Sequence, residues 1–299
     1  MKINLVGPFI VNAPFGTEIA FSKGLKKIGV EVVEVDPNVD MGLEDLADDA
    51  DATVVFKSCV GAEDYLDRVG GVKIVYQPDD ARFPHIKQMM MNMRAYCDHF
   101  LSFDKYGAEL ATMMRYETSE VLLLTADNEL YYPSPNEIER DIDISFIGSL
   151  GDQIAHASRR KMINLVDSFA KQNGLKTFFG STNDTSKIVD VYRRSKVVLN
   201  HATDVGQYFG YGYGLQCRHF EVGMTRTCLL SNELINSIDC APLFSTFSTE
   251  KSLIENLQML LSNDELRNLA ADKLYYDIND NHLPEHRAKQ LVDYIEKII

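Results

Sequence analysis

The residues best suited to chemistry lie in the stretch 191–230. A short buried strand is expected to end at Asn200, and Arg218 and Glu221 follow three residues apart. If residues 215–224 are helical, this spacing places the cation and the carboxylate on one face, where both can meet one ligand. The carboxylate of Glu221 could accept both hydroxyl protons of a ribose diol. The alternative is that Glu221 stabilises the helix N-terminus through the macrodipole.

A second candidate for ligand binding is the turn Gly148-Ser149, which directly follows the apolar strand expected at 142–147. A glycine-containing turn after a strand lets bare backbone approach an anion. An ordinary connecting turn is the alternative. Three basic residues, 159–161, follow on an expected helix, and arginine can neutralise a diphosphate with donors in a fixed geometry.

These motifs occur in a recognisable order: a strand ending in Phe146-Ile147-Gly148-Ser149, a helix with Arg160, a helix with Tyr192, a strand ending in Leu199-Asn200, and a helix with Arg218-His219-Phe220-Glu221. The order resembles the CgeB-like glycosyltransferases, relatives of the retaining two-domain enzymes that use nucleotide sugars. The resemblance covers residues 141–299. It implies an α/β protein of GT-B fold, with two Rossmann-like domains built on parallel sheets and a C-terminal helical tail.

The resemblance also implies which residues act on the donor. Arg160 and Arg218 would stabilise the departing diphosphate, whereas Arg159 and Lys161 are expected to be solvated. His219 is assigned no role. Contacts with the nucleotide sugar, a UDP-sugar or GDP-sugar, are expected from the residues Gly148, Ser149, Arg160, Gly180, Asn200, Tyr213, Arg218 and Glu221.

The chain departs from the family pattern at two places. Met224-Thr225 stands where a small residue and Gly usually close the helix, and Tyr213 stands where the related Glu-x7-Glu pattern would place its first Glu. The second departure keeps open a non-catalytic nucleotide- or sugar-binding protein of the same fold. Donor hydrolysis or transfer would separate the two readings.

Strands alternate with helices in both halves of the 299-residue chain, which predicts parallel sheets in two domains. Tyr132-Pro133-Ser134-Pro135 has the composition of a linker. We therefore expect an acceptor-side domain at 1–135 and a donor-side domain at 141–299 that includes the terminal helices. In the first domain, Asp80 follows a strand and is the candidate for contact with the acceptor hydroxyl; a turn residue is the alternative.

Composition narrows the class of protein further. The net charge of −14 disfavours duplex DNA as a main partner, although a glycosyltransferase of modified DNA bases stays open. The five cysteines lack the spacing of a disulfide framework or a zinc site, which favours a reducing cytoplasm. No apolar run reaches the length of a membrane span, and neither a bound metal nor a tightly held cofactor is expected.

Overall fold

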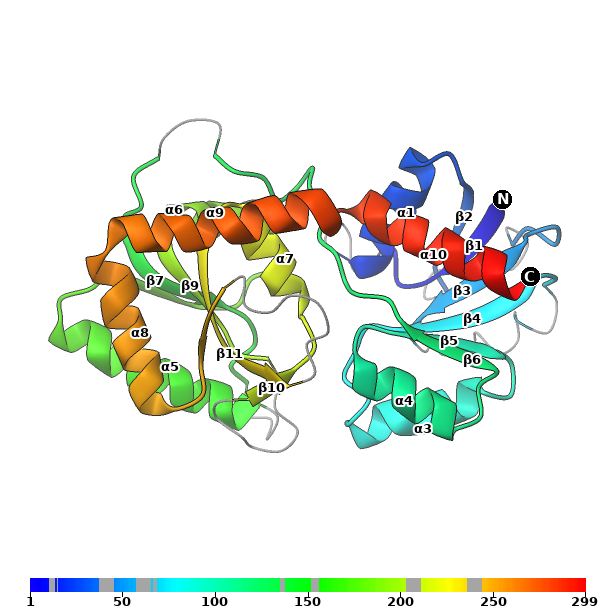
Figure 1. Cartoon of the computed structure of the whole chain (residues 1–299), viewed down its shortest axis with the longest axis horizontal. Helices are drawn as coiled ribbons and strands as arrows, with labels where there is room; N and C mark the ends of the chain where they lie inside the picture. The colour runs from blue at the N-terminus through cyan, green and yellow to red at the C-terminus, as the bar shows by residue number, and fades with distance from the viewer. Residues whose placement is uncertain are drawn as a thin grey trace. The chain divides into compact units, whose positions relative to one another are not determined.

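The computed structural model describes residues 1–10, 14, 16–37, 46–57, 66, 69–134, 138–151, 156–202, 211–235 and 244–299; within these, the side chains of 211–213 and 235 are not described. The chain folds into two compact units (Figure 1). The first unit contains Met1–Ala126 together with Leu283–Ile299, and the second contains Asp127–His282.

The first unit is built on a six-stranded parallel sheet of order β2-β1-β3-β4-β5-β6. Its strands are β1 (Lys2–Val6), β2 (Glu31–Val35), β3 (Ala52–Phe56), β4 (Val72–Gln77), β5 (His99–Ser102) and β6 (Thr118–Val121). Its helices are α1 (Thr17–Lys27), α3 (Pro84–Met93), α4 (Lys105–Met113) and α10 (Pro284–Ile298). Parallel strands joined through helices need cover on both faces of the sheet.

Along the central strands, apolar side chains point alternately to the two faces of the sheet, and helices pack against both faces. Val55 and Val75 pack with Met90 of α3 in one buried cluster. The next residues, Phe56 and Tyr76, point to the other face, where their rings lie 5.5 and 5.2 Å from the ring of Phe21 on α1. Because successive side chains of a strand point to opposite faces, both faces of this sheet are apolar.

Helix α10 ends the chain but packs in the first unit, alongside α1 (Figure 1). Gly24 of α1 lies against the backbone of Pro284, so a Cβ at position 24 would overlap the carbonyl of that proline. Lys27 and Glu285 form an ion pair of 2.6 Å between the two helices. The buried Arg287 donates a hydrogen bond of 3.3 Å to the carbonyl of Leu124, where β6 leads out of the sheet.

The second unit is built on a parallel sheet of order β10-β11-β9-β7-β8, in which β12 also pairs with β11. Its strands are β7 (Ile142–Ile147), β8 (Thr177–Gly180), β9 (Ser195–Asn200), β10 (Tyr211–Tyr213), β11 (Cys228–Ile235) and β12 (Ser245–Phe247). Its helices are α5 (Ala157–Gln172), α6 (Thr185–Arg194), α7 (Cys217–Met224), α8 (Glu250–Ser262) and α9 (Asp264–Asn281). The core on one face joins Phe146 and Leu199 to Met162 of α5 and Leu257 of α8.

These parallel sheets confirm the α/β architecture expected from the sequence, with corrections to single elements. Strand β6 begins its pairing with β5 at Thr118, opposite His99. Helix α4 was not expected. The helix expected at 215–224 begins at Cys217, and Tyr211–Tyr213 forms a short strand paired with β11.

Candidate active site

The carboxyl edge of the second sheet gathers several of the expected residues. Strand β7 runs into Gly148, β8 ends at Gly180 and β9 ends at Asn200. The backbone N–H of Gly148 donates a hydrogen bond of 2.8 Å to the carbonyl of Gly180, so these two glycines are direct neighbours. In parallel α/β sheets this edge is where ligands collect.

Arg218, in the first turn of α7, reaches over this edge. Its Nη1 donates a hydrogen bond of 2.7 Å to Oδ1 of Asn200, and its guanidinium carbon lies 5.1 Å from the centre of the Phe146 ring. A Cβ at Gly148 would come within 2.8 Å of Nη2 of Arg218 and 3.1 Å of the Phe146 ring. The absence of a side chain at position 148 therefore gives Arg218 its place beside the turn.

Arg159 approaches the same turn from α5, which corrects the expectation that it is solvated. It is 7% exposed and donates hydrogen bonds to the carbonyls of Ser149 (3.0 Å) and His201 (2.9 Å). Burial, and the positive charge of Arg218, lower the pKa of Arg159 to about 9. Arg159 thus ties the turn after β7 to the segment after β9.

Arg160 and Lys161, the next two residues of α5, are less buried than Arg159. Arg160 is partly exposed and hydrogen-bonds the carbonyl of Gly151, two residues after Ser149. Lys161 lies on the surface, where it forms an ion pair of 2.5 Å with Glu250 of α8. Arg160 therefore reaches the far side of the turn.

A buried hydrogen-bond network of His219 and Ser231 holds the side chain of Asn200 in place. His219, 1% exposed, has its Nδ1 2.9 Å from the backbone nitrogen and 3.1 Å from the carbonyl of Gln216. Its Nε2 lies 3.2 Å from Oγ of Ser231 and 3.3 Å from Nδ2 of Asn200, and Nδ2 donates to Oγ of Ser231 (3.1 Å). This network turns Oδ1 of Asn200 toward Arg218. Sequence reasoning missed His219, although its position three residues after Gln216 matches a capping box.

We expect the buried His219 to make folding stability depend on pH. Burial lowers its pKa to about 3, below the ordinary 6.5, so stability is fully present above pH 6.5 and is lost as the pH falls toward 3. One proton gives a slope of at most about 1.4 kcal/mol per pH unit. His219→Gln can keep the cap and cannot titrate, so urea unfolding between pH 8 and 5 should lose less stability than in wild type. The exposed His85 provides the control: His85→Gln should follow wild type, and parallel curves for all three proteins would contradict the account.

Glu221 follows Arg218 by three residues on α7, and its carboxyl group contacts two tyrosines. The hydroxyl of Tyr192 on α6 donates to Oε2 at 3.3 Å, and the Tyr131 hydroxyl is a second donor. Burial raises the pKa of Glu221, although Arg218 and both tyrosines oppose that shift. Since α7 begins at Cys217, Glu221 is in its second turn, where the macrodipole interaction proposed as the alternative role is weak.

The remaining expected residues are found elsewhere. Tyr213 ends β10, and its side chain lies outside the described part of the structure. Asp80 belongs to the first unit, where its carboxylate accepts hydrogen bonds from the backbone N–H (2.9 Å) and Nε (2.8 Å) of Arg82. Asp141 and Asp143 form ion pairs with Arg194 and Lys196, respectively, at 2.7 Å each.

The described residues contain no cluster suited to a metal ion. Within these ranges no group of three or more His, Cys, Asp or Glu side chains is arranged to hold one. No helix in the described part is long and apolar enough to span a membrane. The donors that converge at the carboxyl edge are guanidinium and amide groups, which suit an anion.

Comparison with known families supports the order of motifs on this sheet. The model of the glycosyl transferase-like family matches residues 133–293, more than half of the chain. The chain belongs to the glycosyl transferase-like family. A search of the curated proteins finds no match. The CgeB-like subfamily is therefore not decided by the family match.

Solved structures show the fold of this glycosyltransferase. An alpha-glucosyltransferase in complex with UDP and a 13-mer DNA is 14% identical, with TM-score 0.73 over 99% of this chain and 100% of that chain. An alpha-glucosyltransferase in complex with UDP-glucose and DNA containing an abasic site is 13% identical, with TM-score 0.69 over 99% and 98%. Sucrose-phosphate synthase from Thermosynechococcus elongatus is 9% identical, with TM-score 0.65 over 99% and 98%. The GT-B fold expected from the sequence is confirmed.

Proposed function

We propose that this glycosyltransferase transfers a sugar from a nucleotide-diphosphate sugar to an acceptor hydroxyl, and that the diphosphate binds beside the turn after β7. One observation carries the proposal. Arg159 and Arg218 both lie at this turn, and the acceptors recorded for them among the described residues are carbonyl, amide and hydroxyl oxygens. Among the described residues, the Nε of each arginine is buried without a hydrogen-bond partner. A polyanion at this position would supply acceptors and further countercharge to the two arginines.

The proposed reaction needs cations that are fixed in place. The bond between the anomeric carbon and the diphosphate oxygen breaks, the acceptor oxygen bonds to that carbon, and the acceptor loses its proton. Negative charge on the diphosphate grows as the first bond breaks, so fixed guanidinium donors stabilise the transition state more than the bound donor. Arg218 is held by Asn200, and Arg160 can follow the outer phosphate from the Gly151 side.

Glu221 is our candidate for the ribose diol, as an acceptor that two tyrosine hydroxyls already orient. Gly148, Ser149 and Gly180 would border the diphosphate through their backbone. We infer a uridine nucleotide ahead of guanosine because two of the similar structures are in complex with UDP or UDP-glucose. Membership of the CgeB-like subfamily and retention of anomeric configuration remain part of this proposal, supported by the motif order.

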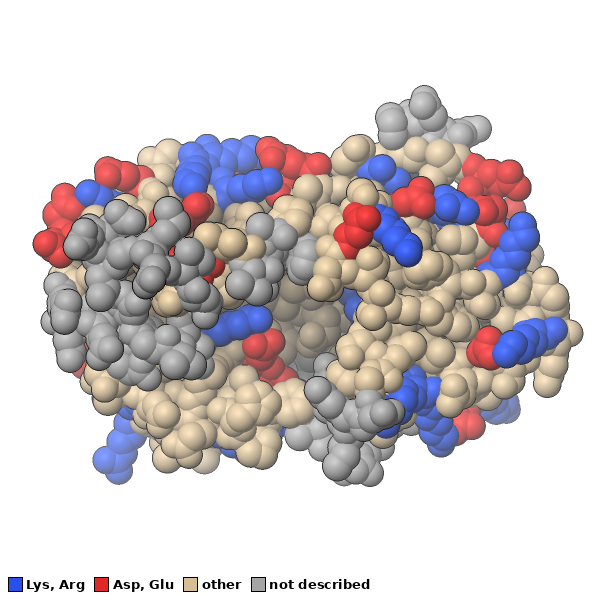
Figure 2. All heavy atoms as spheres, turned by 180° about the vertical axis from the view of Figure 1, so that it is seen from behind, with Lys and Arg blue, Asp and Glu red and all other residues tan. Residues whose placement is uncertain are grey.

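The first unit is proposed as the acceptor side, with Asp80 near the carboxyl end of β4 as one contact. The similar alpha-glucosyltransferases were solved with DNA, which makes DNA an acceptor to test here. Against it stand the net charge of −14 and the alternation of basic with acidic side chains on the face shown in Figure 2. A cytoplasmic setting is supported by Cys97 and Cys228, which form no disulfide within the described part of the chain.

A thermal-shift screen of nucleotides and nucleotide sugars tests the donor proposal. At about one hundred times its dissociation constant, a true donor should stabilise the fold by roughly 2.7 kcal/mol. We expect stabilisation by at least one uridine or guanosine diphosphate sugar, or by the free diphosphate. If no nucleotide raises the melting temperature, the donor site proposed on the second unit is wrong. Duplex DNA in the same screen, at two salt concentrations, tests whether DNA binds as the acceptor.

A further inference from the structure

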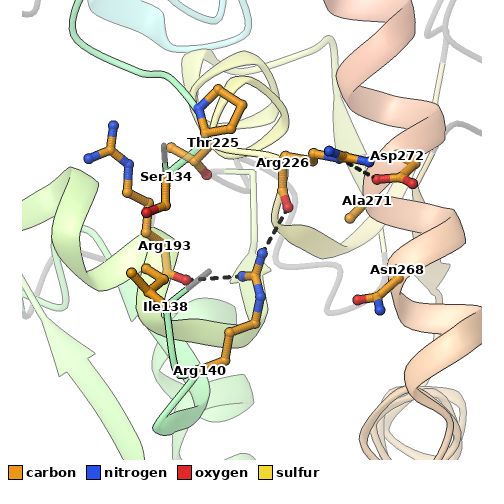
Figure 3. A pocket seen from close by; sticks show the side chains of 10 residues that line it. Ser134, Ile138, Arg140, Arg193, Thr225, Arg226, Asn268, Ala271 and Asp272 are labelled. Atoms are coloured by element: carbon orange, nitrogen blue, oxygen red, sulfur yellow. Dashed lines mark hydrogen bonds and ion pairs between the residues drawn. The ribbon is translucent and has the colours of Figure 1, made fainter. Parts of the chain in front are cut away.

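A cavity of about 580 Å³ lies within the second unit (Figure 3). It is at the amino-terminal ends of the strands, whereas Gly148 and Asn200 are at the carboxyl ends of β7 and β9. Its lining comes from the segments that enter β7, β9 and β11 and from α9. The volume is within the range of small-molecule sites. The described lining residues are Pro133, Ser134, Ile138, Arg140, Arg193, Thr225, Arg226, Asn268, Ala271 and Asp272.

Positive charge predominates among the described lining residues. They include three arginines and one carboxylate, in a chain whose net charge is −14. Arg226 uses that carboxylate, since its Nε lies 2.5 Å from Oδ1 of Asp272. Arg140 and Arg193 have only oxygens of carbonyls and a hydroxyl as recorded acceptors among the described residues.

Arg140 serves mainly as a scaffold between two helix ends. It donates to the carbonyls of Arg193 (3.2 Å) and Ser195 (2.6 Å), where α6 ends, and to that of Arg226 (3.0 Å), just after α7 (Figure 3). These carbonyls carry the negative ends of the two helix dipoles. Arg140 therefore offsets the partial negative charge of the carbonyls at these two helix ends.

Arg193 is held in place but is not satisfied. Its guanidinium carbon lies 3.9 Å from the centre of the Tyr132 ring, and its Nε donates to the Tyr132 carbonyl at 2.8 Å. Among the described residues, its Nη2 is buried without a hydrogen-bond partner. A buried, unpaired N–H of a charged group is costly, and an anion would satisfy it.

Backbone strain is found at the same cavity. Arg226 follows the C-cap of α7 with φ of 55°, a left-handed conformation that glycine normally supplies at this position. An arginine here keeps a strained backbone while its side chain reaches Asp272 across the cavity (Figure 3). Strain of this kind is retained where the side chain has a use.

We propose that this cavity is a second anion site, which takes a phosphate-class oxoanion on Arg193. The site is separate from the proposed donor site and does not depend on it. An anion bound here would connect the ends of α6 and α7 with α9.

The chain contains no tryptophan, which allows a reporter specific to this cavity. Tyr132 is 46% exposed and stacks on Arg193, so Tyr132→Trp places the single indole of the protein against the proposed anion. Titration with inorganic pyrophosphate, at constant ionic strength, should change the indole emission along a saturable curve. Adding Arg193→Gln should weaken that binding at least tenfold.

Two further variants of the reporter protein separate this site from the donor site. Arg218→Gln should leave the emission curve unchanged, and Ser134→Asp, which adds a carboxylate at the cavity, should weaken binding at least tenfold. Circular dichroism confirms that each variant is folded, and Ser134→Asp decides the question if Arg193→Gln does not fold. The proposal is overturned if emission does not saturate, if neither cavity variant weakens binding, or if Arg218→Gln abolishes it.

Discussion

Substitution of Arg218 by glutamine should lower kcat for sugar transfer by about 100-fold or more, with a smaller effect on acceptor KM. Glutamine keeps a hydrogen-bond donor near Asn200 but removes the charge that meets the diphosphate at the turn after β7. Loss of one fixed donor that meets developing negative charge typically costs about 10² to 10³ in kcat. Steady-state kinetics with the donor identified by thermal shift provide the measurement.

The matched control is Arg194→Gln. Arg194 is also a basic residue of the second unit, but it forms surface ion pairs with Asp141 and Asp190 at 2.7 and 3.1 Å. Its substitution should leave kcat within about twofold of wild type, because exposed ion pairs contribute little. An Arg218→Gln enzyme with near wild-type turnover would place the departing diphosphate elsewhere.

Substitution of Glu221 by glutamine should weaken nucleotide binding at least tenfold, which corresponds to about 1.4 kcal/mol. A carboxylate that accepts two ribose hydroxyl protons makes charge-assisted hydrogen bonds, which an amide of the same shape replaces poorly. Calorimetry should compare the ribonucleotide with its 2′-deoxy form, since the preference for ribose should shrink in the mutant. Glu250→Gln, on the surface of α8, is the control.

The same substitution should raise the stability of the protein without ligand. Burial raises the pKa of Glu221, so its contribution to stability is fully present below the ordinary value of 4.5 and is lost as the pH rises through the raised pKa. The neutral glutamine avoids that loss, and we expect the melting temperature to rise by about 2 °C at pH 7. The gain should vanish below pH 4.5. A mutant with lower stability at pH 7 and unchanged nucleotide binding would make Glu221 structural.

Much of the fold could be predicted because local patterns carry it. The apolar strands are bounded by turn residues, and glycine or polar pairs follow their carboxyl ends, as at Gly148 and Asn200. Helix α4 was missed although its signal is present: Asp104 caps it by accepting the backbone N–H of Gly107 at 2.7 Å. The edge position of β6 depends on pairing with β5, which no local pattern specifies.

Arg159 and Arg160 are adjacent, but their positions around helix α5 determine which of them points into the protein. Arg159 shares a face with Met162, Ile163 and Val166, which are buried residues three, four and seven positions further along α5. This spacing could have indicated that Arg159 points inward. Resemblance to the family pointed to Arg160 instead, and adjacent residues on a helix differ in direction by about 100°.

The surroundings of Glu221 could not be predicted from local sequence. Tyr131 precedes it by ninety residues and Tyr192 lies on another helix, so only the tertiary fold brings their hydroxyls to one carboxylate. The role of His219 depends likewise on Ser231 in β11. Long-range contacts of this kind set the pKa values and the orientation of the site.

The central claim is that the turn after β7, with Arg159 and Arg218, holds the diphosphate of a sugar donor during transfer. The most direct measurement is release of nucleoside diphosphate from a panel of nucleotide sugars, with wild type, Arg218→Gln and Arg194→Gln compared at equal concentrations. We predict that wild type and Arg194→Gln release UDP or GDP from at least one donor, and that Arg218→Gln does so at least about 100-fold more slowly. Release by Arg218→Gln at the wild-type rate, or no release by wild type from any donor, would contradict the account.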